Sequence, residues 1–331
     1  MINRILPLLA LCLALAGSAT AQIYRATDPL AHTYSIVARD PRTGELAVAV
    51  QSHWFSVGTS VSWAEAGVGA IATQSFTNKS FGPRGLALLK SGQSAQQTLD
   101  ELLRTDEGRD VRQVAIVDNQ GRVATHTGAK CIDFAGHQQG AQFSVQSNMM
   151  LTEQVPAAMA RAFERNAQLP LPERLLAALE GAQAAGGDIR GRQSAALLVV
   201  RGTASAEPWT DRLVDLRVDD SAEPLRELGR LLRLRRAYEH MNAGDLAVEN
   251  NDVPGAIREY EAAEKLFPDN LEMQYWHAIS LANKQRLPEA LKLLRPIFKQ
   301  EPNWRLLTER LPKVGLLSVS AAELKQILNA K

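Results

Sequence analysis

Cysteine is almost missing from this sequence. The chain of 331 residues contains two cysteines, Cys12 and Cys131. Cys12 lies in an N-terminal apolar segment that we expect to be removed, so the mature chain would keep only Cys131. A single cysteine excludes an intramolecular disulfide bond. A lone cysteine most often behaves as a small apolar side chain.

Neither sign of charge is in excess. The sequence has 37 Lys plus Arg against 36 Asp plus Glu, which gives a formal net charge of +1. This balance offers no overall field to attract nucleic acid or an anionic membrane. Beyond residue 21 no apolar run approaches the roughly 20 residues that a membrane helix needs. We therefore expect no nucleic-acid partner and no membrane span.

Sequence motifs of several common enzyme classes are also missing. The chain has no GK[ST] phosphate loop, no Gly-x-Ser-x-Gly turn and no His-Glu-x-x-His pair. Gly67-Val68-Gly69 lacks the third glycine of a dinucleotide-binding loop. These absences exclude the commonest kinase, dehydrogenase and hydrolase classes, and we expect no cofactor.

The N-terminus has the three parts of a secretory signal peptide. Met1–Arg4 is positively charged, Ile5–Ala16 is apolar, and Ala19-Thr20-Ala21 is a small-x-small cleavage site. We expect residues 1–21 to be a signal peptide and Gln22 to begin the exported chain. The protein would then be periplasmic or secreted.

Residues 33–220 alternate between strand and helix patterns. Period-two apolar patterns predict strands that are joined mainly by short hairpin turns, and leucines at helical spacing predict two pairs of helices. Hairpins favour antiparallel sheets with helices packed outside them, rather than a doubly wound parallel fold. The predicted strands are 33–39, 45–51, 67–73, 113–118, 122–127, 143–147, 194–201 and 213–218, and the predicted helices are 85–90, 95–104 (N-cap Ser94), 153–167 and 172–184.

Residues 224–331 are predicted to be helical and contain an internal repeat. Ala256, Tyr260, Ala263 and Pro268 recur 34 residues later as Ala290, Leu294, Ile297 and Pro302. This period resembles tetratricopeptide repeats, which are helix–turn–helix units. Gly244, Asn251 and Asp252 are expected at the turn of the first unit. The repeats would contact a protein partner or a second copy of the chain, and a plain helical cap is the alternative.

Two clusters of polar residues are candidates for binding. Asp188, Arg190 and Arg192 follow Gly186-Gly187, and arginines can bind a carboxylate through two hydrogen bonds. A solvated loop is the alternative. The segment from Gln74 to Gly85, which includes Asn78, would form a pocket wall or an ordinary strand-to-helix loop.

A metal site is a weaker candidate. His126, Cys131 and His137 offer ligand types that suit zinc. Their spacing is loose and no fourth ligand is evident apart from Asp133, so the favoured interpretation has no metal.

Thr33 opens the first predicted strand directly after His32. A threonine hydroxyl becomes an effective nucleophile when a base lies beside it, and an N-terminal threonine carries its own base in its α-amine. Position alone favours an ordinary strand residue.

Several segments in register resemble the family called domain of unknown function 1028. They are TYSIVARDPRTGELAVAV, WAEAGVGAIATQSFTNKSFGPRGLALL, GRVATHTGAKCIDFAGH, VQSNMM and AAGGDIRGRQSAALLVV. The resemblance runs from about Thr33 to about Val218. It implies an α+β fold: a four-layer αββα sandwich of the N-terminal-nucleophile (Ntn) hydrolase type, here followed by the helical-repeat segment.

The resemblance also implies a chemistry. Thr33 matches the nucleophile position of Ntn hydrolases, whose nucleophile is freed by removal of the preceding residues. Asn148 or Asn78 would donate hydrogen bonds to the oxyanion, while Asp188 and Arg190 would orient the substrate or the amine. With Gln74, Asn78, Arg190 and Arg192 as binding residues, the substrate would be a small molecule or a peptide.

Residues 22–32 are an obstacle to this chemistry, because a free Thr33 amine requires a cut between His32 and Thr33. The leading hypothesis is an exported hydrolase of an amide-like bond that matures by this cut. The alternatives are a non-catalytic exported binding or scaffold protein, and a metal-dependent activity at His126, Cys131 and His137.

Overall fold

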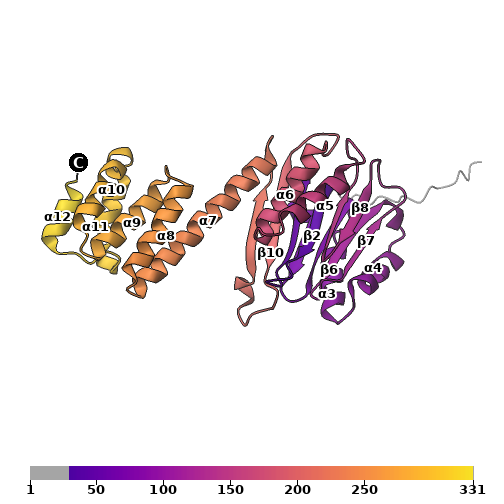
Figure 1. The fold of residues 1–331 in the computed structure, drawn as a ribbon, viewed down its shortest axis with the longest axis horizontal. Coiled ribbons are helices and arrows are strands. Elements are labelled where there is room, and N and C mark those ends of the chain that lie inside the picture. The colour runs from indigo at the N-terminus through magenta and orange to yellow at the C-terminus, as the bar shows by residue number, and fades with distance from the viewer. Residues whose placement is uncertain (1–29, 331) are drawn as a thin grey trace, which may run out of the picture. The chain divides into compact units, whose positions relative to one another are not determined.

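The computed structural model of the protein describes residues 30–330 (Figure 1). Contacts divide the chain into two compact units, Met1–Leu228 and Gly229–Lys331. The predicted signal peptide and residues 22–29 of the predicted leader lie outside the described residues. No helix within residues 30–330 has the length and apolar character that crossing a bilayer requires.

The strands of the first unit form two antiparallel sheets. They are β1 (Leu30–Ala31), β2 (Thr33–Arg39), β3 (Leu46–Ser52), β4 (Ser62–Glu65), β5 (Gly69–Phe76), β6 (Arg112–Asp118), β7 (Val123–Thr127), β8 (Gly136–Gly140), β9 (Phe143–Ser147), β10 (Ser194–Val200) and β11 (Arg212–Val218). The first sheet, sheet A, has the order β1-β5-β6-β7, and β4 also pairs with β5. The second, sheet B, has the order β11-β10-β3-β2-β9-β8. The prediction of antiparallel sheets is confirmed.

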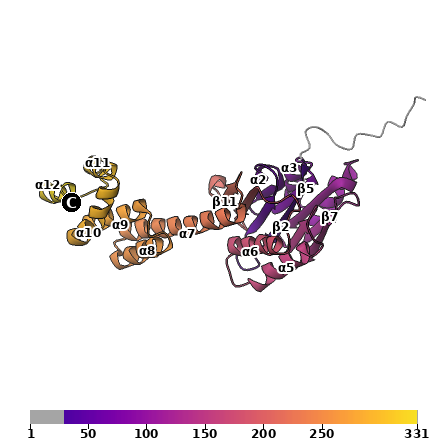
Figure 2. The ribbon, with the colours of Figure 1, turned by 90° about the horizontal axis from the view of Figure 1, so that it is seen from above.

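Helices contact both sheets. Those of the first unit are α2 (Gly58–Val61), α3 (Phe81–Lys90), α4 (Ala95–Arg104), α5 (Val155–Arg165) and α6 (Leu171–Ala184), with short 3-10 turns at Arg109–Val111 and Pro208–Thr210. Helices α3 and α4 pack on strands of sheet A, whereas α5 and α6 pack on strands of sheet B. Figure 2 shows α3 and α6 on opposite sides of β2 and β5. Strands of the two sheets also contact each other, β2 with β5 and β6.

The hairpin of β2 and β3 shows why these segments become strands. Val37 and Val50 are fully buried in an apolar cluster that also contains Ala72 and Ala115 of sheet A. Alternate residues point to the other face, where the Tyr34 hydroxyl donates to Oε1 of Gln183 on α6 (3.0 Å). Because both faces of β2 are covered, its sequence is mostly apolar rather than strictly alternating.

The predicted cap of α4 is present. The Ser94 side chain accepts from the Gln97 backbone N–H, and the Gln97 side chain accepts from the Ser94 N–H. This reciprocal arrangement satisfies amides that the first helical turn leaves without partners. It fixes the start of α4 at Ala95, as the sequence predicts.

Three strands were not predicted. Strand β8 has the polar sequence GHQQG, lies at the edge of sheet B and is largely exposed, so it has no apolar pattern to identify it. Strand β4 is half-buried throughout. Strand β1 is two residues long and pairs Leu30 with Phe76 and Ala31 with Ser75.

The second unit consists of helices that follow the predicted repeat. The remaining helices are α7 (Pro224–Glu249), which contains the boundary between the units, α8 (Val253–Leu266), α9 (Leu271–Asn283), α10 (Leu287–Gln300), α11 (Asn303–Arg310) and α12 (Ala321–Leu328), with a 3-10 turn at Pro312–Val314. Both ends of α10 lie 34 residues after the corresponding ends of α8. The repeated positions in α8 and α10, namely Ala256, Tyr260, Ala263, Ala290, Leu294 and Ile297, are all buried.

The expected turn needs one correction. Asn251 adopts a positive φ of 58° and Asp252 caps α8, so both lie at the turn as predicted. Gly244 instead lies inside α7, where an added Cβ would stand 2.5 Å from the Tyr260 ring. This glycine therefore allows helix α7 to approach Tyr260 closely rather than forming a turn.

Candidate active site

The site lies where the layer between the two sheets changes from apolar to polar. Along β2 the inward-facing residues run from Val37 through Ser35 to Thr33, and along β5 they run from Ala72 to Gln74. All five are fully buried. Polar side chains buried at this depth require hydrogen-bond partners, and the partners they find define the site.

The backbone carbonyl of His32 accepts two strong hydrogen bonds. The hydroxyl of Ser52, at the end of β3, donates to it at 2.6 Å. The Nη2 of Arg190 donates to the same oxygen at 2.8 Å. Ser52 lies directly opposite Thr33 in the β2–β3 register. The oxygen of the peptide bond that precedes Thr33 is therefore held by one hydroxyl and one guanidinium.

Asp188 holds Arg190 in place. Its carboxylate accepts from Arg190 Nε (3.0 Å) and Nη2 (2.7 Å), and its side chain is fully buried. The His53 backbone N–H also donates to Asp188 (3.2 Å). Gly187, directly before Asp188, has a φ of 64°, a conformation that glycine adopts without steric cost. Such bidentate pairing restricts the guanidinium to one orientation.

Thr33 is fully buried in the intact chain. Its hydroxyl donates to the Ala31 carbonyl at 3.3 Å, and its own carbonyl accepts from the Asn148 backbone N–H at 3.1 Å. The chain changes sheets here, because Ala31 pairs in sheet A and Thr33 pairs in sheet B. Residues 30–32 therefore lie beside the Thr33 hydroxyl.

The side chain of His32 is also enclosed. Its Nδ1 lies 2.7 Å from Asn148 Oδ1, and its ring meets the Phe76 ring edge-on at a centroid distance of 5.6 Å. Burial lowers the pKa of His32 below its ordinary value of 6.5. The Asn148 hydrogen bond and the Asp188 charge oppose this shift in pKa, and the Arg190 charge adds to it.

A buried network of amide side chains lies beneath Thr33. Gln74 Nε2 donates to Gln113 Oε1 at 2.7 Å, and Gln74 Oε1 accepts from the Ser35 hydroxyl at 2.6 Å. The Gln146 side chain also donates to the Ser35 hydroxyl. Gln74 was predicted to bind substrate, but these neighbours in the two sheets already satisfy its amide group. Its contact with the site is a weak bond to the Thr33 carbonyl at 3.4 Å.

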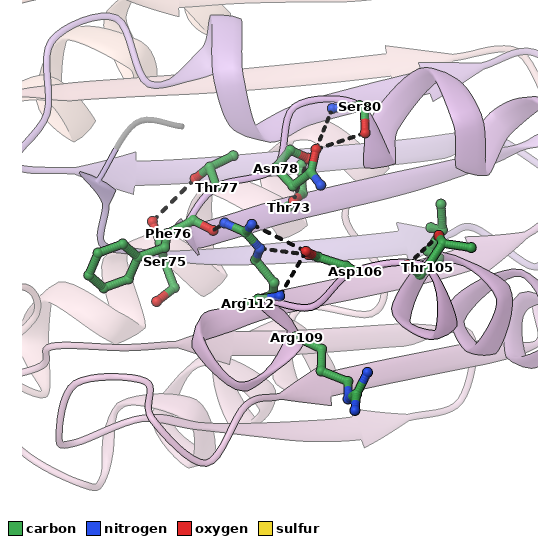
Figure 3. A network of polar contacts seen from close by, with 12 residues as sticks. Thr73, Ser75, Phe76, Thr77, Asn78, Ser80, Thr105, Asp106, Arg109 and Arg112 are labelled. Atoms are coloured by element: carbon green, nitrogen blue, oxygen red, sulfur yellow. Dashed lines mark hydrogen bonds and ion pairs between the residues drawn. The ribbon is translucent and has the colours of Figure 1, made fainter. Parts of the chain in front are cut away.

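A separate charged network holds the backbone of Phe76, whose ring contacts the His32 ring (Figure 3). The buried Arg112 donates to Asp106 (2.7 Å) and to the Phe76 carbonyl (2.5 Å). Burial tends to raise the pKa of Asp106, but hydrogen bonds from Arg112, the Gly108 N–H and Asn78, together with the Arg112 charge, outweigh it, so the net shift in pKa is downward. Asn78 belongs to this network, because its Oδ1 accepts from Ser80 and its side chain bonds Asp106. The side-chain hydrogen bonds of Asn78 therefore go to this network, whereas the donors to the His32 carbonyl are Ser52 and Arg190.

The predicted site residues thus divide into two groups. Thr33, Asn148, Asp188 and Arg190 gather around the His32–Thr33 peptide bond, and Gln74 lies below it. Arg192 instead pairs with Glu223 at 2.6 Å on the surface. Asn148 was expected to donate to an oxyanion, but its amide group is oriented differently. Its Nδ2 donates to Gln113 Oε1 (2.8 Å), and its oxygen faces the His32 ring.

The three candidate metal ligands have separate partners. His126 Nε2 contacts the Arg109 carbonyl, His137 Nδ1 contacts the Thr127 hydroxyl, and Cys131 donates to the Arg112 carbonyl. Burial raises the pKa of the Cys131 thiol, which disfavours the thiolate that zinc binds. Within residues 30–330 no group of three or more His, Cys, Asp or Glu side chains is arranged to hold a metal ion.

Ser52 and His32 are the site residues that sequence reasoning missed. Ser52 carries no motif, and its only signal is the hairpin register that places it opposite Thr33. Together with Arg190 it gives the site two hydrogen-bond donors aimed at one carbonyl oxygen, the arrangement that stabilises an oxyanion during acyl transfer.

Comparisons with known proteins identify the first unit. A family described as "Family of unknown function (DUF1028)" matches residues 33–228. The crystal structure of protein SPO2555 from Silicibacter pomeroyi, a DUF1028 protein, is 31% identical, with a TM-score of 0.55, and the match covers 61% of this chain and 88% of that chain. Anbu (ancestral beta-subunit) from Yersinia bercovieri is 13% identical over 59% of this chain and 91% of that one, with a TM-score of 0.30, too low to establish a common fold. No curated protein matches the sequence. This chain belongs to the DUF1028 family.

Proposed function

We propose that the protein is an exported hydrolase of an amide-like bond, with Thr33 as an N-terminal nucleophile after maturation. In this proposal the first unit is a four-layer αββα sandwich of the Ntn-hydrolase type, and the second unit is a pair of tetratricopeptide-like repeats. Residues 1–21 direct export to the periplasm or the medium. Residues 22–32 are a leader that is removed.

The single observation that carries the proposal is the double hydrogen bond on the His32 carbonyl. Donors from Ser52 and Arg190 at 2.6 and 2.8 Å polarise the carbonyl next to the Thr33 hydroxyl. Donors fixed before reaction are worth more than water, because they need no reorganisation as charge develops on the oxygen. The peptide bond that must be cut is therefore the one whose carbonyl is activated.

Self-cleavage follows from these groups. The Thr33 oxygen bonds to the His32 carbonyl carbon, the C–N bond breaks, and the Thr33 nitrogen takes the hydroxyl proton. This leaves an ester on Thr33, and water hydrolyses it to release a leader that ends in the His32 carboxylate. An α-amine such as the one freed on Thr33 ordinarily has a pKa of about 8, so part of it is neutral and able to act as a base.

In later turnovers the amine deprotonates the Thr33 hydroxyl, which attacks the carbonyl of the substrate. Ser52 and Arg190 hold the oxyanion, and Asp188 orients Arg190. The substrate amine departs with the proton, and water hydrolyses the acyl-enzyme. No cofactor enters any step.

Non-catalytic binding is the second candidate, and the burial of Thr33 favours it. An intact leader keeps the hydroxyl from any substrate, so a chain that retains the leader would act only through its surfaces or its helical repeats. The two candidates therefore differ in the N-terminus of the exported protein.

The test is the N-terminus of protein recovered from an exporting host. Intact mass and N-terminal sequencing should give a chain that begins at Thr33, and Thr33→Ser should also mature whereas Thr33→Ala should keep residues 22–32. Export with the leader retained by the unaltered chain, together with hydrolysis by that intact form, contradicts the mechanism. Retention without any hydrolysis favours the binding protein.

A further inference from the structure

We propose that the pocket around the His32 side chain is the acyl-group pocket of the mature hydrolase. It selects an acyl group that carries a neutral planar ring with an N–H donor, for which imidazole is the template. This inference rests on the proposed function and names its substrate class: amides of histidine-like acyl groups.

The pocket is already formed in the intact chain, and it makes specific contacts with the His32 ring. The His32 residue is 2% exposed in the intact chain. One ring nitrogen meets Asn148 Oδ1 at 2.7 Å, and the ring stands edge-on to Phe76 with an interplanar angle of 88°. Arg112 donates a hydrogen bond to the Phe76 carbonyl and so restrains the Phe76 backbone. A planar ring is thus held by one polar contact and one aromatic contact.

Hydrogen-bond partners determine which way the Asn148 amide is oriented, that is, where its oxygen and its nitrogen lie. Gln113 Nε2 faces the Ser147 and Gly136 carbonyls, which can only accept, at 2.9 and 3.2 Å. Its Oε1 therefore faces Asn148, whose Nδ2 must donate to it (2.8 Å). Asn148 Oδ1 is left facing His32, so the His32 Nδ1 carries the proton. The pocket consequently requires a donor from its occupant.

The pocket also favours a neutral occupant. Burial lowers the pKa of the His32 imidazole, although the Asn148 hydrogen bond partly opposes the shift. The nearby Arg190 guanidinium further disfavours a second positive charge, while the Asp188 carboxylate acts in the opposite direction, and the net shift in the pKa of His32 is downward. An acyl group with a cationic side chain is therefore disfavoured, whereas a neutral imidazole fits.

The leader can stand for the substrate because both reactions pass through the same kind of ester. Self-cleavage places the leader acyl group, which ends in His32, on the Thr33 oxygen. A substrate places its own acyl group on that oxygen, with the carbonyl held by the same Ser52 and Arg190. The side chain of that acyl group then falls where the His32 ring lies, once the leader has departed.

The test uses mature protein that begins at Thr33 and coumarin amides of acetyl-alanyl dipeptides. The variable second residue is histidine, phenylalanine, leucine or alanine. We expect kcat/KM for the histidine amide to exceed that for the phenylalanine amide by at least about tenfold at neutral pH, since phenylalanine leaves the Asn148 oxygen unpaired. The advantage should shrink below about pH 6, where free histidine becomes protonated.

Two variants distinguish a change in the selectivity of the pocket from a general loss of structure. Asn148→Asp keeps an acceptor facing the ring and adds negative charge, although it loses the bond that Asn148 Nδ2 donates to Gln113 Oε1, so the preference for histidine should survive and extend to lower pH. Asn148→Leu should abolish the preference for histidine while some hydrolysis of the leucine amide remains. Because Asn148 is buried and its variants can fail to fold, binding of acetyl-alanyl-histidine and acetyl-alanyl-phenylalanine to the unaltered mature protein gives an independent measurement, with the histidine peptide expected to bind at least about tenfold more tightly.

The outcomes are distinguishable. Hydrolysis of all four amides at similar rates overturns the inference and leaves the hydrolase standing. If mature protein cleaves none of them, equal binding or no binding of the two peptides likewise overturns it. A chain that never releases its leader defeats the proposed function and the inference together.

Discussion

Replacing Ser52 by alanine tests the oxyanion site most directly. The Ser52 hydroxyl donates to the His32 carbonyl at 2.6 Å, and the substitution removes this donor while Arg190 keeps its bond at 2.8 Å. In enzymes with such sites, loss of one donor slows the reaction by roughly 10²- to 10³-fold. The expected effect of Ser52→Ala is therefore a fall of about two orders of magnitude in the rate of self-cleavage.

Stability alone would not produce this effect. The lost hydrogen bond contributes about 1 kcal/mol to folding. Ser194 offers a matched control, because it lies opposite Ser52 in the β3–β10 register and is equally buried. The Ser194 hydroxyl bonds the Trp54 carbonyl and the Val57 N–H instead of His32. Ser194→Ala should therefore destabilise the fold to a similar or greater extent and leave self-cleavage near its original rate.

The assay follows loss of the leader over time. Chains that begin at Gln22 are purified intact, incubated, and analysed by mass spectrometry for release of residues 22–32. Thermal unfolding of each chain is recorded in parallel. Equal rates for Ser52→Ala and the unaltered chain, or equal slowing by Ser194→Ala, would show that the His32 carbonyl is not the oxygen that develops charge.

Further predictions concern the nucleophile, the orientation of Arg190 and the pH dependence. Thr33→Ala should block leader release completely, while Thr33→Ser retains it, as intact mass will show. Asp188→Asn weakens the bidentate grip on Arg190 and should slow release by about tenfold or more, measured in the same time course. Because burial lowers the pKa of His32, the intact folded chain binds fewer protons than the unfolded chain just below the ordinary value of 6.5, so its stability should fall as the pH drops through that value. The melting temperature of the uncleaved Thr33→Ala chain should therefore fall between about pH 7 and pH 5. Adding His32→Gln to this chain should make the fall in melting temperature smaller. His137, whose pKa is also lowered by burial, accounts for a remaining fall.

Most of the features of the fold that were predicted correctly depend on local sequence patterns. The β2–β3 hairpin, the cap at Ser94 and the 34-residue offset of α8 and α10 each depend on residues close together in the chain. Strand β8 was missed because its polar residues lie at an exposed sheet edge, where no burial selects apolar side chains. The role of Gly244 was misjudged because its requirement comes from Tyr260 on another helix.

The candidate site was predicted by two routes. Asp188 and Arg190 were candidates because their residue types carry binding chemistry, whereas Thr33 became the candidate nucleophile through the resemblance to the DUF1028 family. Ser52 depends on register: a second strand beginning at Glu45, as predicted, would place Gln51 opposite Thr33, whereas the observed start at Leu46 places Ser52 there. A shift of one residue turns every side chain of a strand to the other face, so a small error in a strand end conceals the hydroxyl that donates to the His32 carbonyl.

The change of sheet at His32 links the proposed cut to opening of the site. Before the cut, Thr33 is anchored in sheet B and holds the short strand β1 on sheet A, so pairing of Leu30–Ala31 costs little entropy. After the cut the leader is a separate molecule that gains translational freedom, and only the two-residue pairing and the contacts of His32 with Asn148, Phe76 and Arg190 oppose its departure. Breaking one peptide bond would therefore free the amine, and departure of the leader would then vacate the His32 pocket and expose the Thr33 hydroxyl. Before that event the same burial that positions the groups for self-cleavage keeps them from any other substrate.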